Sequence, residues 1–104
     1  TTVEVTGAGS GGRNQEAALA AAMAVEGGEI LFMAAGTDGV DGPTDAAGGL
    51  VDGSTIGLIE TAGCDPAAAL ANNDSHHALE AGGALIRTGP TGTNVADLWI
   101  VDRT

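Results

Sequence analysis

The run ILFMAA, residues 30–35, is an unbroken apolar stretch bounded by turn residues. The segment GGE precedes it and the segment GTDG follows it. A short continuous apolar run between turns is typical of a central strand that is covered on both faces. We therefore expect residues 30–35 to form a central strand, with other parts of the fold packed against both of its sides.

A helix is predicted immediately before this strand, over residues 14–25. The segment AALAAAMAV is rich in helix formers, and the glycine pair at 27–28 ends the pattern. Asn14 is expected to cap the helix. Residues 2–6, TVEVT, precede it and read as a short strand. This order of strand, helix and strand predicts a right-handed unit with parallel strands.

The remainder of the chain reads as short helices followed by strands. Helices are predicted over residues 54–62, from Asp65 and Pro66 onward, and from Asp74 or Ser75 to 82–83. Strand-like runs cover residues 84–88 and 95–101. We expect an α/β fold: a single compact layered domain over residues 1–104, with a mostly parallel or mixed sheet flanked by helices.

Composition restricts the classes of partner. The chain carries fourteen acidic and three basic residues, which gives a net charge of −11 at pH 7. Binding to nucleic acid or to an anionic membrane needs lysine and arginine, so neither partner is expected. This charge suits a protein adapted to high salt, where self-repulsion is screened, and a basic partner protein is the alternative. The sequence shows no leader-like segment and no long apolar run, which predicts a cytoplasmic protein.

Three polar, glycine-rich loops are candidates for a binding site: residues 7–16, 36–48 and 88–94. The first fits the G-x-G-x-x-G pattern of a dinucleotide-binding turn, and Asp38 lies near the place of a ribose-binding acid. The same backbone suits any phosphate, because a helix N-terminus presents free amide groups. The pattern alone leaves open both an NAD-binding turn and another anion-binding loop.

The second loop contains TDGVDGPTD, which places Asp38, Asp41 and Asp45 within eight residues. Carboxylates this close repel one another unless a cation or hydrogen-bond donors compensate. Magnesium held with substrate phosphates is one interpretation, and a turn-rich loop with aspartates capping amides is the other. The third loop, TGPTGTN, offers hydroxyls to a phosphate or simply connects two strands. It is not a Walker A loop, because the chain has no lysine.

Four blocks occur in a characteristic order: GGRNQE at 11–16, AAGTDGVDGPTDAAG at 34–48, NNDS at 72–75 and TGPTGTNVADL at 88–98. Their order and spacing resemble the C-terminal MOFRL domain of the glycerate 2-kinase family over essentially the whole chain. The resemblance implies a two-domain enzyme that phosphorylates D-glycerate at its 2-hydroxyl with Mg-ATP. It also implies that the site lies in a cleft between a larger Rossmann-like N-terminal domain and this domain.

The resemblance further implies roles for individual residues. Arg13 is the candidate for stabilising phosphoryl charge, because a guanidinium presents paired donors to phosphate oxygens. Asp38, Asp41 and Asp45 are the other catalytic candidates, the first two as magnesium ligands. Further loop residues are expected to bind substrate or phosphate: Gly11, Gly12, Asn14, Gln15, Glu16, Thr37, Gly39, Thr44, Thr91, Gly92, Thr93 and Asn94.

The N-terminal domain that the resemblance implies, with its catalytic lysine, is not in this sequence. We therefore expect the chain to be inactive alone and to self-associate through an exposed apolar surface. Two alternatives remain open. One is a stand-alone phosphate-binding, ligand-binding or interaction module. The other is part of an NAD(P)-dependent hydroxypyruvate reductase, a label that some members of the family carry.

Overall fold

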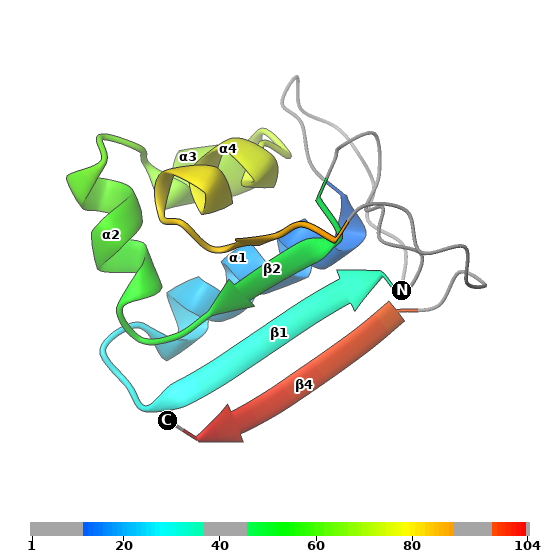
Figure 1. The fold of residues 1–104 in the computed structure, drawn as a ribbon. Coiled ribbons are helices and arrows are strands. Elements are labelled where there is room, and N and C mark those ends of the chain that lie inside the picture. Colours follow the sequence, from blue (N-terminus) through cyan, green and yellow to red (C-terminus); the bar gives the residue numbers. More distant parts are fainter. Residues whose placement is uncertain (1–11, 37–45, 89–96, 104) are drawn as a thin grey trace.

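The computed structural model describes residues 12–36, 46–88 and 97–103 (Figure 1). Helices and strands alternate irregularly along these segments. Their order is α1 (Arg13–Val25), β1 (Ile30–Gly36), β2 (Gly48–Val51), α2 (Thr55–Thr61), α3 (Pro66–Ala71), α4 (Ser75–Ala81), β3 (Leu85–Ile86) and β4 (Asp97–Arg103). The strand expected at 2–6 lies outside the described residues.

The described strands form one sheet in the order β3-β2-β1-β4 (Figure 1). β1, which contains the ILFMAA run, lies between β2 and β4, as predicted for a central strand. The α/β class is also confirmed. The expectation of a mostly parallel or mixed sheet is wrong for the described strands, because each pair is antiparallel. Both hydrogen-bonding edges of β1 are taken by antiparallel neighbours, so no parallel strand can lie directly beside it.

β2 is a strand that the sequence pattern assigns to the end of a loop. Four residues with two glycines give a weak strand signal, since glycine is unfavourable in strands. The structure shows what the second glycine allows. A Cβ atom on Gly49 would lie 2.8 Å from the Cβ of Ala18 and 3.0 Å from Cδ1 of Leu79. The absence of a side chain therefore lets α1 and α4 approach the sheet closely.

The helix boundaries follow the local sequence signals. α1 ends at Val25, and Gly27 then takes a φ of 78°, which glycine adopts without strain. α3 begins at Pro66 as predicted. The Asp65 carboxylate accepts hydrogen bonds from the backbone amides of Ala67 and Ala68 in the first turn of the helix. α2 and α4 lie within their predicted ranges. No helix in the described part of the chain is long and apolar enough to cross a bilayer.

The helices form a layer on one face of the sheet, with α1 behind β1 and β2 in the view of Figure 1. The buried core lies between this layer and the sheet. Its largest fully buried apolar side chains are Leu19, Val51, Ile59 and Leu79. Phe32 and Ala34 of β1 point into this core, since they pair with Val51 and Gly49 on the same face.

The opposite face of the sheet carries the alternate residues of each strand. By the strand register, Met33 lies between Leu50 and Ile100 on this face, and Leu31 lies two residues from Met33. We call these four residues the open face, because the layer of described helices lies on the other side of the sheet. The expected cover on both sides of the central strand is therefore present on one side only within the described residues.

Candidate functional site

The second and third glycine-rich loops join the described structure along one edge of the sheet. Gly36, the last residue of β1, pairs with Asp97, the first residue of β4. On its other side, the Gly36 amide donates to the Ala47 carbonyl at 2.8 Å. The Ala47 amide in turn donates to the Ile86 carbonyl at 2.7 Å. These four residues form one row across the sheet. The described residues that flank the second loop therefore lie beside those that flank the third loop.

The first loop enters α1 at Gly12, close to the same edge. Gly12 is the N-cap residue, with extended backbone, and its carbonyl accepts from the Glu16 amide at 2.9 Å. The prediction that Asn14 caps the helix is wrong. Asn14 lies one residue inside α1, is buried, and accepts a hydrogen bond from Nε1 of Trp99 through its Oδ1 at 3.2 Å. That bond ties the start of α1 to β4.

Trp99 connects the central strand, the edge strand and the start of α1. Besides its bond to Asn14, its ring contacts the ring of Phe32 edge to face, with centroids 5.9 Å apart and planes at 66°. Trp99 nonetheless keeps 52% of its surface exposed. The sequence analysis assigned it no role. The only available signal was that it is one of two aromatic residues in the chain.

The described residues of the GGRNQE block at the start of α1 differ in how exposed they are to solvent. Asn14, Gln15 and Glu16 are polar but buried, whereas Arg13 is exposed. Buried polar side chains are the informative exception in a folded protein, because their desolvation must be compensated. Arg13 places a positive charge beside the helix end whose dipole already favours anions. This arrangement is suited to binding a phosphate or a carboxylate.

The NNDS block forms the turn between α3 and α4. Asn73 is buried and has a φ of 54°, a left-handed conformation that asparagine tolerates better than most residues. The Asp74 amide donates to the Ala69 carbonyl at 2.7 Å, and Ser75 is fully buried. Sequence reasoning used this block for the resemblance but gave its residues no function. Its backbone conformation explains why asparagine suits the second position.

The described residues include one part of the predicted site. Gly12, Arg13, Asn14, Gln15 and Glu16 are placed at the start of α1. The other predicted site residues lie outside the described ranges: Gly11, Thr37, Asp38, Gly39, Asp41, Thr44, Asp45, Thr91, Gly92, Thr93 and Asn94. Among the residues that the structure describes, no group of three or more His, Cys, Asp or Glu side chains could hold a metal ion.

Two described groups have shifted pKa values, and both have structural causes. The hydroxyl and amide of Ser54 donate to the Asp52 carboxylate at 2.7 and 2.8 Å and lower its pKa, in the turn that leads into α2. Partial burial raises the pKa of the Cys64 thiol, and the negative charges of Asp74 and Asp65 add to this shift. Neither group belongs to the row at the sheet edge.

The fold and this edge define a class: an α/β domain in which the described residues that flank the glycine-rich loops lie at one end of the sheet, with a helix start near them. The sequence profile of the MOFRL family matches residues 1–97. The chain belongs to the MOFRL family.

Similar proteins are named as glycerate kinases. The D-glycerate 2-kinase of Thermotoga maritima is 61% identical over 101 residues, which cover 96% of this chain and 24% of the relative. The glycerate 2-kinase of Pyrococcus horikoshii is 48% identical over 96% of this chain and 23% of the relative. A crystal structure of glycerate kinase from T. maritima matches the whole chain with a TM-score of 0.95 and 58% identity. The chain spans about a quarter of the length of these relatives.

Proposed function

We propose that this chain is the C-terminal domain of a glycerate 2-kinase. In this proposal it supplies three glycine-rich loops to a cleft shared with a Rossmann-like N-terminal domain. There, the 2-hydroxyl of D-glycerate is phosphorylated. The observation that carries the proposal is the placement of Arg13 at the start of α1, close to the edge where the other two loops are anchored.

The described residues suggest how this domain contributes. Phosphoryl transfer depends mainly on positioning and on neutralising charge. The exposed Arg13 and the amide groups at the start of α1 would bind phosphoryl or carboxylate oxygens. The bond between Asn14 and Trp99 would hold that helix start in a fixed place relative to β4. Mg-ATP would supply the phosphoryl group and a divalent cation, for which Asp38 and Asp41 remain the candidate ligands.

The proposal includes the setting of the enzyme. The isolated chain would be inactive, because catalysis would need groups from the N-terminal domain. We also propose a cytoplasmic protein. The net charge of −11 supports work at high salt without binding to nucleic acid or membranes. Self-association of the isolated chain through its exposed apolar residues would be a consequence of the missing domain.

A chimera tests this function directly. These 104 residues would replace the matching quarter of the T. maritima relative, and phosphorylation of D-glycerate by Mg-ATP would be measured. We expect activity, and we expect Arg13→Ala to lower kcat/KM about a hundredfold through loss of charge stabilisation. Arg103→Ala is the matched control, because Arg103 lies at the opposite end of β4. Equal effects of the two variants would argue against a role for Arg13 in the site.

A second candidate function is supported by a different relative. A provisionally named hydroxypyruvate reductase of Agrobacterium vitis is 47% identical over 91 residues, which cover 86% of this chain. The same chimera can be assayed for oxidation of NADH or NADPH with hydroxypyruvate. Turnover in that assay without phosphorylation of glycerate would favour the reductase over the kinase.

A further inference from the structure

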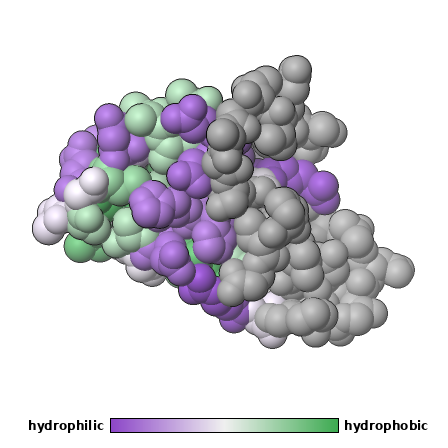
Figure 2. Space-filling model, turned by 90° about the horizontal axis from the view of Figure 1, so that it is seen from above, coloured by the Kyte–Doolittle hydropathy of each residue, from purple (hydrophilic) through white to green (hydrophobic). Residues whose placement is uncertain are grey.

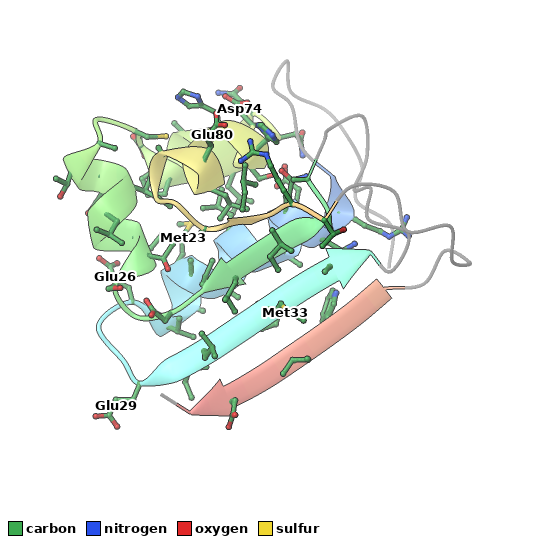
Figure 3. The ribbon with its side chains drawn as sticks, in the orientation of Figure 1. Met23, Glu26, Glu29, Met33, Asp74 and Glu80 are labelled. Atoms are coloured by element: carbon green, nitrogen blue, oxygen red, sulfur yellow. The ribbon has the colours of Figure 1, made fainter. Side chains whose placement is uncertain are left out.

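The residues of the open face are apolar, as residues are on a surface that is buried against another part of a protein. β1 places apolar residues on both of its sides, whereas a sheet with one solvated face normally alternates apolar and polar residues. Leu50 keeps 43% and Ile100 keeps 46% of its surface exposed. Met33, labelled in Figure 3, lies between them by the strand register.

The distribution of charge supports the same interpretation. The chain has fourteen acidic residues, yet none pairs with Met33, and Asp102 and Asp52 adjoin the open face only at its Leu31 end. In contrast, Figure 2 shows hydrophilic residues spread among hydrophobic ones over the described part of the surface seen from above. An apolar area in so acidic a protein indicates a contact surface.

A hollow of about 180 Å³ lies at one side of this face. Leu31 and Leu50 of the sheet and Leu58 of α2 line its apolar part, and Asp52, Ser54 and Thr55 line its polar part. Leu58 is 53% exposed, although it is a large apolar residue. Anchor residues of protein interfaces typically fill hollows of this kind. The size fits one side chain from a partner, which would contact the leucines on one side and the Asp52 turn on the other.

We propose that the open face and its hollow are the docking surface for the polypeptide that longer relatives carry outside the matched quarter. The inference rests on the proposed function, because it assumes that this chain works as part of such an enzyme. The relatives supply the occupant: the matched region is 24% of the T. maritima kinase and 23% of the P. horikoshii kinase. Three quarters of those chains must pack somewhere, and this face offers apolar surface for it.

A second copy of this chain is a poorer occupant. Each copy carries a net charge of −11, so a pair of copies carries a net charge of −22. Repulsion between like-charged partners weakens association and is reduced only by salt. A partner segment with fewer acidic residues avoids that cost.

Cysteine labelling tests the proposal in the chimera with the T. maritima relative. Cys64 and any other native cysteine are replaced by alanine, and Leu50→Cys, Ile100→Cys and Met23→Cys are made one at a time. Met23, also labelled in Figure 3, lies on α1 and is 38% exposed, which makes it the matched control. Thiol labelling rates are then compared between the chimera and the 104-residue chain, with the latter diluted until its rates no longer depend on concentration, so that self-association does not protect the same residues.

We expect Leu50→Cys and Ile100→Cys to react about tenfold more slowly in the chimera, because only local opening would expose them there. Met23→Cys should react equally in both proteins. Equal rates at all three positions would overturn the proposal. Protection that disappears when the chimera is diluted would also overturn it, because it would identify a second copy as the occupant. Protection in a chimera without kinase activity would refute the proposed function and leave the docking surface standing.

Discussion

The two faces of the central strand are similar in composition and different in cover. On one face, Phe32 and Ala34 pack with Val51 under the helix layer. On the other, Met33 and its neighbours meet no described helix. Under the docking proposal, the apolar residues on both sides of this strand would reflect cover on both sides in the longer enzyme. A single described layer can supply only half of that cover.

The largest expected effect is a difference between the two faces in how much an alanine substitution lowers the free energy of unfolding. Leu79→Ala should lower it by about 3 kcal/mol, since Leu79 is fully buried in the core and its removal leaves a cavity. Ile100→Ala should lower it by less than about 1 kcal/mol, because the side chain is already half exposed. Urea denaturation of the 104-residue chain, followed by circular dichroism, measures both. Similar losses at the two positions would mean that the open face is covered in the isolated chain.

Two glycine substitutions should have opposite signs. Gly49→Ala should lower the free energy of unfolding by about 2 kcal/mol, since its Cβ would collide with Ala18 and Leu79 on the covered face. Gly57→Ala lies within α2 with no atom within 4 Å of the new Cβ, and should raise it by about 0.5–1 kcal/mol. The same denaturation experiment decides. A stabilising Gly49→Ala would show that the helix layer packs less closely than the structure indicates.

A smaller effect is expected at the contact between Asn14 and Trp99. Trp99→Phe removes the N–H donor and keeps an aromatic ring, and Asn14→Ala removes the acceptor. A double-mutant cycle should give a coupling free energy of about 1 kcal/mol for this hydrogen bond. Additive effects of the two changes would show that the bond contributes nothing to the position of α1.

The smallest effect concerns Cys64, which packs at the margin of the covered core. Burial and the charges of Asp74 and Asp65 raise its pKa, so the reactive thiolate should form at higher pH than in the unfolded chain. Alkylation rates measured against pH, with and without urea, give both midpoints. Asp74→Asn should move the folded midpoint to lower pH. A folded midpoint at or below the unfolded one would contradict the structure.

Local signals made much of the fold predictable. The ILFMAA run gave the central strand, and Asp65 with Pro66 marked the start of α3. The antiparallel directions of the described strands were not predictable, because local patterns do not report which strands become neighbours. The parallel pair predicted for residues 2–6 and 30–35 stays a prediction, since residues 2–6 lie outside the described residues. β2 was missed because its glycines are explained by tertiary contacts: Gly48 lies against the backbone of β1, and Gly49 lies against α1 and α4.

For the candidate site, only the prediction of a helix start beside Arg13 can be compared with the described residues. The GGRNQE block indicated an anion-binding helix start, and the structure places that block at the start of α1. The hydrogen bond from Trp99 to Asn14 joins residues 85 positions apart in the chain, so no local pattern could reveal it. For the same reason, the capping role predicted for Asn14 was wrong: a distant partner occupies its side chain.

The position of Trp99 also has a spectroscopic consequence. The chain contains one tryptophan and no tyrosine, so its ultraviolet emission comes almost entirely from this residue. The indole lies half exposed where α1 meets β4, beside the edge at which the loops are anchored. Any event that alters the hydration of this junction should shift the wavelength or intensity of that emission. The protein therefore carries its own optical reporter at the place where ligand and partner domain would meet.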